Sequence, residues 1–282
     1  MVKINIGGVP EHFNYPWHFG IENELFKSKG IDLNWKNYPG GTGDMCKDLR
    51  SNQLDLAIVL TEGIIKDIIL GNPSKIIQTY VGSPLFWGVH VSHNSDYKQI
   101  KDLKGKTAAI SRKGSGSHLM TYVNAISNKW NIKNDIKFKT VNDIGGGISA
   151  LSKGTADYFL WEKFTTKPYV DRKIFRSLGD CATPWPCFMI ASTNQFLKNN
   201  HKVIETLLNI INSITQSIKS IDNIDQILSK NYDLNIEDVK NWMKLTTWSQ
   251  KKPNEKEIFE IQNKLMVSEI ISDIASYPTL VN

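Results

Sequence analysis

The sequence predicts a two-lobed α/β protein with two mixed, mostly parallel sheets joined by a two-strand hinge. Three observations indicate this fold class. Short segments of strand character alternate with segments of helical periodicity, and the connections between them are short. This alternation occurs twice along the chain, so each set can form a sheet of its own. The chain has 282 residues, a length that suits two hydrophobic cores better than one.

The first set of elements begins with alternating polar and apolar residues at 3–6. Gly7 and Gly8 close this segment, as is typical of a strand that ends in a turn. Pro16 opens a helical stretch through residues 17–29, which Gly30 ends. Further strands are expected at residues 31–38, 54–60 and 76–81, with helices at residues 44–52 and 62–70.

The second set of elements is complete in itself. Strands are expected at residues 107–111, 136–141 and 156–160, with helices from Ser115 or Ser117 to Trp130 and at residues 148–153. Apolar extended segments at residues 85–92 and 187–192 bracket this set and would form the hinge. We therefore expect lobe 2 to be an insertion of residues 92–186. Lobe 1 then comprises residues 1–91 and 187–282, with helical segments at 196–221, 222–230, 236–245 and 255–276.

Composition and charge exclude several classes of function. Hydrophobic residues make up 40% and charged residues 22%, as in soluble globular proteins. The net charge is +6, but the lysines are scattered and form no basic stripe with interleaved aromatic residues, so we expect no nucleic-acid partner. The longest apolar runs, such as residues 56–60, are too short to cross a bilayer, so we expect no membrane insertion.

The cysteines and the first residues bear on the cellular compartment. Cys46, Cys181 and Cys187 are an odd, sparse set and predict no disulfide framework. The chain opens directly with a strand and shows no apolar leader or cleavage site. The sequence therefore predicts a cytoplasmic protein, or a periplasmic one if a signal peptide has been removed.

Ligand-binding residues are expected in the loops that follow strands, because ligands of open α/β sheets bind beyond the carboxyl ends of the strands. Backbone N–H groups at glycine turns and helix N-termini, together with hydroxyl groups, would hold an anionic group. The candidates of this kind, with the basic side chain beside them, are Gly41, Thr42, Thr61, Arg112, Ser115 and Ser117. A plain glycine turn is the alternative interpretation of residues 39–43.

Ring-bearing and acidic residues crowd the same loops. Rings with a polar rim are typical of a small-molecule pocket, although rings at such positions also serve as core residues. A carboxylate left unpaired beside an anion costs free energy, so the glutamates indicate a ligand that also carries a hydrogen-bond donor. The candidates of these kinds are Glu11, His12, Tyr15, Trp17, Glu62, Trp87, Trp161, Glu162 and Trp185.

Catalytic motifs are poor, so we expect neither an enzyme nor a cofactor or metal. His90 and His93 lie three residues apart in an expected strand and would point to opposite faces of the sheet. Residues 114–118 do not match the Gly-x-Ser-x-Gly nucleophile pattern. An enzyme would need a metal or a cofactor bound to a lysine, for which Lys113 is the candidate.

The order of several short motifs resembles that of type II periplasmic solute-binding proteins. These motifs are Pro-Gly-Gly-Thr-Gly at residues 39–43, Asp-Leu-Ala-Ile at 55–58, Asp-Leu-Lys-Gly-Lys at 102–106, Gly-Ser-Gly-Ser at 114–117 and Gly-Thr-Ala-Asp at 154–157. The resemblance covers nearly the whole chain and is closest to the branch of sulfonate and taurine receptors and thiamine-pyrimidine-precursor proteins. Within that branch, residues 61–63, 84–88 and 110–118 are similar to a leaderless subgroup found in yeasts and bacteria.

This resemblance implies a hinged protein that closes on a small anionic or heteroaromatic molecule, such as a sulfonate or an aminopyrimidine. Two other functions stay open. One is an exported receptor, which would have a transporter permease as its partner and an export leader. The other is an enzyme of thiamine or pyrimidine precursor metabolism. The Cys-rich motif of the iron-dependent pyrimidine synthase is absent from this chain.

Overall fold

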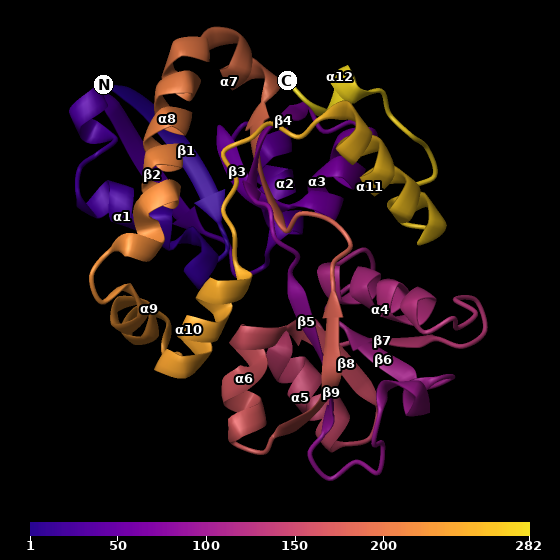
Figure 1. The fold of residues 1–282 in the computed structure, drawn as a ribbon. Coiled ribbons are helices and arrows are strands. Elements are labelled where there is room, and N and C mark those ends of the chain that lie inside the picture. Colours follow the sequence, from indigo (N-terminus) through magenta and orange to yellow (C-terminus); the bar gives the residue numbers. More distant parts are fainter. The chain divides into compact units, whose positions relative to one another are not determined.

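The computed structural model describes residues 1–282 and divides the chain into two compact units. Figure 1 shows the helices and strands of both units. Unit 1 comprises Met1–Ser83, Trp185–Met266 and Ile271–Asn282, and unit 2 comprises Pro84–Pro184 and Val267–Ile270. The chain therefore leaves unit 1 after Ser83 and returns to it after Pro184.

The sheet of unit 1 has five strands in the order β2-β1-β3-β10-β4. The strands are β1 (Val2–Gly8), β2 (Ile31–Asn37), β3 (Leu56–Leu60), β4 (Ser74–Val81) and β10 (Phe188–Thr193). β1 pairs in parallel with β2 and β3, whereas β10 pairs antiparallel with β3 and β4. The sheet is therefore mixed, with β10 opposing the other four strands.

Helices precede and follow the inserted unit. The α-helices are α1 (Tyr15–Glu22), α2 (Thr42–Arg50), α3 (Thr61–Ile69), α7 (Asn194–Asn199), α8 (His201–Ser217), α9 (Ile224–Tyr232), α10 (Ile236–Leu245), α11 (Glu255–Val267) and α12 (Tyr277–Leu280). Short 3₁₀ turns lie at His12–Asn14, Lys27–Lys29 and Ile218–Ser220. None of the helices combines the length and the apolar character that crossing a bilayer requires.

The sheet of unit 2 repeats this arrangement in the order β7-β6-β8-β5-β9. Its strands are β5 (Phe86–Ser92), β6 (Thr107–Ile110), β7 (Lys137–Thr140), β8 (Tyr158–Glu162) and β9 (Phe175–Ala182). Its helices are a 3₁₀ turn at Ile100–Leu103, α4 (Gly116–Ser127), α5 (Ile144–Ser152) and α6 (Lys163–Asp171). Here β5 is the opposing strand, antiparallel to β8 and β9.

The observed sheets confirm the predicted two-lobed α/β class with mixed sheets. The boundary of the inserted unit differs from the expected residues 92–186, because β5 pairs with β8 and β9 and so lies wholly in unit 2. Near the boundary, Leu85 and Thr183 exchange hydrogen bonds within unit 2, and the Cys187 N–H donates to the Ser83 carbonyl within unit 1. The two connecting segments are thus paired within each unit.

Two elements of unit 2 were absent from the sequence-based expectation. The edge strand β9 contains Gly179 and Asp180 and has a single partner strand, so it lacks the apolar run of a central strand. Helix α6 contains Pro168, a residue that ordinarily ends a helix. Polar composition and an internal proline therefore concealed both elements.

Three expected helices end differently in the structure. The first ends at Glu22 instead of residue 29, because Glu24 adopts a left-handed backbone with φ of 53°. The expected helix at 196–221 is divided at Asn200, whose φ of −134° is not helical, into α7 and α8. Helix α11 ends at Val267 instead of residue 276. Apolar periodicity alone does not locate such breaks.

Candidate ligand-binding residues

The long loop after β1 is part of the core of unit 1. His12 is buried, and its ring centroid lies 4.2 Å from that of Trp242 in an edge-on contact. Burial lowers the pKa of His12 to about 3, so the ring is neutral. Glu11 is half-buried and Tyr15 is buried.

Trp17 is a core residue in the structure, which differs from the expected place in a ligand wall. Its side chain has no exposed surface. Its ring centroid lies 5.8 Å from that of Phe26 and 6.0 Å from that of Tyr80. Trp17 lies near the start of α1, as expected, but its side chain is on the buried face of that helix.

The loop after β2 brings the starts of α2 and α3 together. Gly41 precedes α2 with φ of 73°, a left-handed conformation that favours glycine. Thr42 begins α2, and its hydroxyl accepts a hydrogen bond of 3.0 Å from the Leu60 N–H at the end of β3. A Cβ at Gly63 would lie only 2.6 Å from the Thr42 Cγ2, so a side chain at residue 63 would disrupt this approach.

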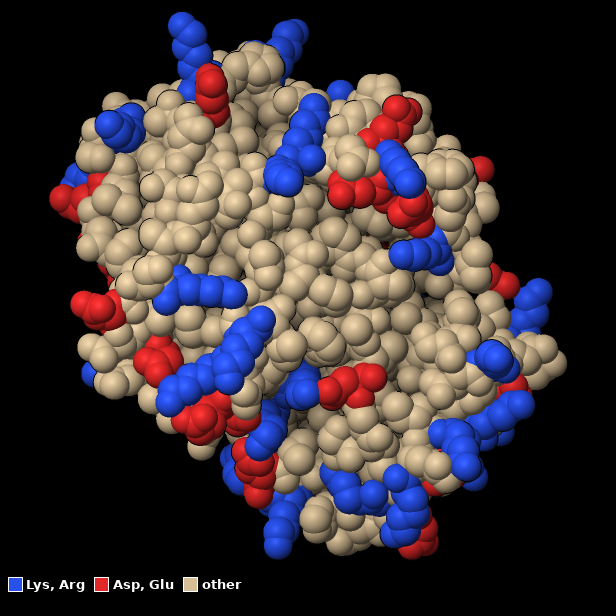
Figure 2. Space-filling model, viewed as in Figure 1, with Lys and Arg blue, Asp and Glu red and all other residues tan.

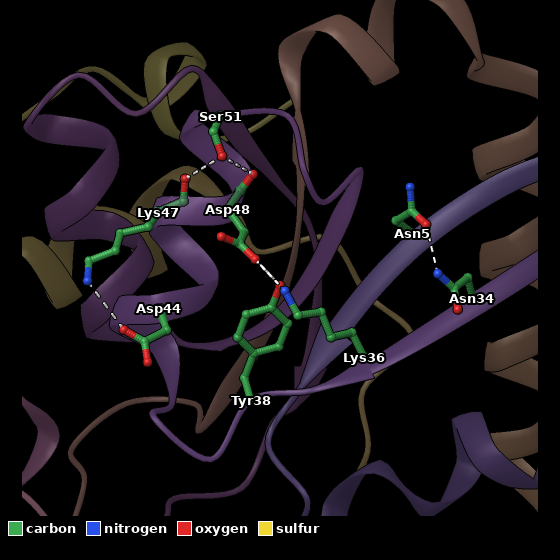
Figure 3. A network of polar contacts seen from close by, with 8 residues as sticks. All are labelled: Asn5, Asn34, Lys36, Tyr38, Asp44, Lys47, Asp48 and Ser51. Atoms are coloured by element: carbon green, nitrogen blue, oxygen red, sulfur yellow. Dashed lines mark hydrogen bonds and ion pairs between the residues drawn. The ribbon is translucent and has the colours of Figure 1, made fainter.

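Helix α2 is held against β2 by a polar network that the sequence analysis did not identify (Figure 3). The Asp48 carboxylate accepts hydrogen bonds from Lys36 Nζ at 2.8 Å and from the Tyr38 hydroxyl. These two bonds hold the pKa of Asp48 below its usual value. Lys36 also lies over the Tyr38 ring, 4.6 Å from its centroid. The network links β2 to α2, the helix whose start is a candidate anion contact.

The start of α3 is bonded to the segment by which the chain returns to unit 1. The Thr61 hydroxyl donates to the carbonyl of Pro186, and the Thr61 N–H donates to the carbonyl of Cys187 at 3.2 Å. The Trp185 indole Nε1 donates to the Glu62 Oε2 at 2.8 Å. Glu62 is only 3% exposed, and burial raises its pKa to about 7 against the opposing effect of this bond.

In unit 2 the serine-rich turn before α4 is closed by its own hydrogen bonds. The Ser117 hydroxyl accepts from the Ser111 N–H at 2.9 Å, and the Ser115 hydroxyl accepts from the His118 N–H at 3.3 Å. The two hydroxyl oxygens lie 3.1 Å apart. Arg112 is exposed. The turn therefore prepares the N-terminus of α4 but uses both hydroxyls locally.

The remaining candidates lie along β5 and β8. Trp87 and Glu162 are opposite each other in the antiparallel register, and the buried Trp87 indole N–H has no hydrogen-bond partner. The half-buried Trp161 stacks on Phe159 at 5.2 Å between ring centroids. Glu162 caps α6, since its Oε2 accepts from the Thr165 N–H at 2.6 Å. Burial also raises the pKa of Glu162.

The structure thus sorts the candidates into separate groups. Thr42, Thr61, Glu62 and Trp185 lie around the starts of α2 and α3, whereas His12 and Trp17 belong to the core.

Figure 2 shows Lys and Arg side chains interspersed with Asp and Glu on one face of the molecule, so the excess positive charge is spread over this face.

Comparison with solved structures defines the class of fold. The Candida albicans CA3427 gene product, described as founding a new family with the generic periplasmic binding protein fold, matches with a TM-score of 0.89 and 26% identity over 98% of this chain and 92% of that chain. The alkanesulfonate-binding protein SsuA of Xanthomonas axonopodis pv. citri, solved with MOPS bound, matches with a TM-score of 0.83 and 13% identity over 99% of this chain and 98% of that chain. The chain therefore has the two-lobed periplasmic-binding-protein fold.

A family model matches part of unit 2. Residues 87–181 match the family described as Ca3427-like PBP, where PBP denotes periplasmic binding protein. The aliphatic sulphonate binding protein SsuA of Escherichia coli matches with a TM-score of 0.74 and 15% identity, over 99% of this chain and 92% of that chain. No curated relative matches the sequence. The predicted resemblance to the type II periplasmic-binding-protein-like family is confirmed, and the chain is similar to its Ca3427-like members.

Proposed function

We propose that this protein is a solute-binding protein for a small molecule with an anionic or heteroaromatic part, such as a sulfonate or an aminopyrimidine. The observation that carries the proposal is the joining of the starts of α2 and α3 through Thr42, Leu60 and Gly63. The first N–H groups of a helix have no partner within the helix and carry partial positive charge. Two such starts in contact suit a ligand with an acceptor or anionic group.

The composition of the surrounding residues supports a binding role. The proposed contacts in unit 1 are hydroxyl, carboxyl and indole groups held by hydrogen bonds, at Thr42, Thr61, Glu62 and Trp185. Such pre-positioned polar groups provide orientation and specificity in small-molecule sites. The likeness to SsuA, which was solved with MOPS bound, supports a sulfonate as the first ligand class to test.

A thermal-shift panel tests this proposal. The panel contains sulfonates, carboxylates, phosphates, aminopyrimidines and amino acids at increasing concentration. A ligand that binds the folded state raises the melting temperature once its concentration passes its dissociation constant. We expect a saturable shift from sulfonates or aminopyrimidines, confirmed by calorimetry at one-to-one stoichiometry. Saturable binding of none of the classes would contradict the proposal.

The cytoplasmic location stays a prediction of the sequence. Immunoblotting of fractionated cells from the source organism tests it, with one compartment marker for each fraction. Detection in an exported fraction would favour a transport receptor with a permease partner.

A further inference from the structure

The carboxyl group of Glu62 has one oxygen whose hydrogen-bonding partner is missing from the folded chain. Its Oε2 accepts the bond from the Trp185 indole at 2.8 Å. Its Oε1 has no hydrogen-bond partner, and the residue is only 3% exposed. A buried carboxyl oxygen without a partner costs free energy, and native proteins keep few of them.

Two neighbouring groups favour the hydrogen-bond-accepting form of this carboxyl group, against the opposing effect of burial, which raises its pKa to about 7. Glu62 is the second residue of α3, where the helix N-terminus favours negative charge. The Trp185 indole can only donate a hydrogen bond, and it donates to the neighbouring oxygen of the same carboxyl group. Both contacts stabilise the ionised carboxyl group, which is the main form above about pH 7, and the chemistry that completes Oε1 in this form is a donor.

The carboxyl group is also held in place by its neighbours. The Thr61 hydroxyl donates to the carbonyls of Pro186 and Cys187, and the Thr61 N–H also donates to the Cys187 carbonyl. The Thr42 hydroxyl accepts from the Leu60 N–H two residues before Glu62. A fixed acceptor discriminates more strongly than a mobile one, because it cannot turn to find another donor when the ligand lacks one.

We propose that Glu62 determines specificity, its Oε1 accepting a hydrogen bond from an amino or ammonium group of the ligand. The inference rests on the proposed function and narrows it. The ligand carries an N–H donor in addition to its anionic or heteroaromatic part. An analogue without the donor leaves the buried oxygen unpaired and binds about 10- to 100-fold more weakly, the range expected for a hydrogen bond to a charged group.

Two pairs of probes test the donor requirement by isothermal titration calorimetry at pH 7.5. Taurine is compared with ethanesulfonate, and 4-aminopyrimidine with pyrimidine, because each pair differs by one amino group. We expect at least one donor-bearing probe to bind the wild-type protein 10- to 100-fold more tightly than its analogue. In Glu62→Gln, whose amide keeps the size of the side chain, that preference falls to less than threefold.

The matched control is Asp55→Asn. Asp55 lies in the same unit just before β3, at the opposite end of that strand from Glu62, and burial raises its pKa as well. Its carboxylate accepts from the Asn5 N–H, which an asparagine side chain can replace. This variant keeps the donor preference. If Glu62→Gln does not fold, Glu62→Asp replaces it. The shorter side chain keeps the charge but moves the carboxyl oxygens away from the ligand, so the preference for the donor-bearing probe should also fall.

The outcomes separate this inference from the proposed function. Equal binding within both pairs, or a preference that survives in Glu62→Gln, overturns the role of Glu62 and leaves a solute-binding protein. Tight binding of donor-free probes alone does the same. If no probe binds and no compound of the wider thermal-shift panel binds either, both proposals fail.

Discussion

Each unit has a glutamate at, or two residues after, the end of the middle strand of its sheet, yet the two side chains have different partners. Glu62 follows β3 and Glu162 ends β8, and these are the middle strands of the two sheets. The Glu162 carboxylate accepts a hydrogen bond from the Thr165 N–H at the start of α6. Glu62 has one oxygen bonded to Trp185 and one without a partner.

A carboxylate near the end of a strand is structural in unit 2 and has a free oxygen in unit 1, because the two side chains start from different positions relative to the following helix. Glu162 is itself the N-cap of its helix, so its side chain reaches the free N–H groups of the first turn. Glu62 lies two residues beyond the N-cap, Leu60, where it meets a segment from a distant part of the chain. A shift of two positions thus changes the partner and the role.

The largest expected effect is a loss of stability in Trp17→Ala, which tests whether Trp17 is a core residue of unit 1 or a ligand-binding residue. Trp17→Ala removes a fully buried side chain, so the free energy of unfolding should fall by about 3–5 kcal/mol. Urea unfolding followed by circular dichroism measures this. Ligand affinity under conditions where the variant remains folded should change less than threefold. A large loss of affinity in the folded variant would return Trp17 to the site.

The next effect is the dependence of stability on pH at Glu62. Burial raises its pKa to about 7, so the folded state holds the proton more tightly than the unfolded state. The free energy of unfolding should therefore fall as pH rises from about 4.5 to about 7, by on the order of 3 kcal/mol, and stay level above that range. Glu62→Gln should remove this contribution.

Paired urea unfolding curves at pH 5 and pH 8 measure the difference between the wild-type protein and Glu62→Gln. The free energy of unfolding of Glu62→Gln minus that of the wild-type protein should be larger at pH 8 than at pH 5. Burial lowers the pKa of His12 to about 3 and of His90 to about 4, which lowers stability as pH falls below 6.5 in both proteins. The comparison cancels that contribution. A constant difference between the two proteins would show that Glu62 titrates normally.

A smaller effect is expected from the capping glutamate of unit 2. Glu162→Ala removes the acceptor of the Thr165 N–H, and loss of an N-cap costs about 0.5–2 kcal/mol. Hydrogen exchange of the first amides of α6 should accelerate while those of α3 stay unchanged. Equal acceleration in both helices would mean that the two glutamates are not separate in role.

The smallest effect is expected from the surface network at α2. Lys36→Ala removes a bond to Asp48 from an exposed lysine, so the loss of stability should be smaller than that of Glu162→Ala and should shrink in high salt. Thermal unfolding at low and high ionic strength measures it. A larger, salt-independent loss would show that the network holds α2 more strongly than its exposure suggests.

Much of the fold follows from local pattern. Short apolar or alternating segments located nine of the ten strands, because β-strands with a buried face leave a period of two or a continuous apolar run. The edge strand β9 and the proline-containing α6 were missed, since each is stabilised by its neighbours in unit 2 against its own composition. The sequence predicted candidate site residues at the strand ends, but it could not tell which of their polar groups are hydrogen-bonded within the chain and which have no partner.

Local sequence pattern specifies the succession of strands and helices, their division into two sets, and the Thr-Glu-Gly segment after the strand at residues 56–60. Only the tertiary structure decided that β5 and β10 run against their neighbours, that Trp17 is buried, and which glutamate keeps an unpaired oxygen. The physical reason is the range of the interactions. Periodicity and capping act over a few residues, whereas Glu62 receives its partner from Trp185, 123 positions along the chain.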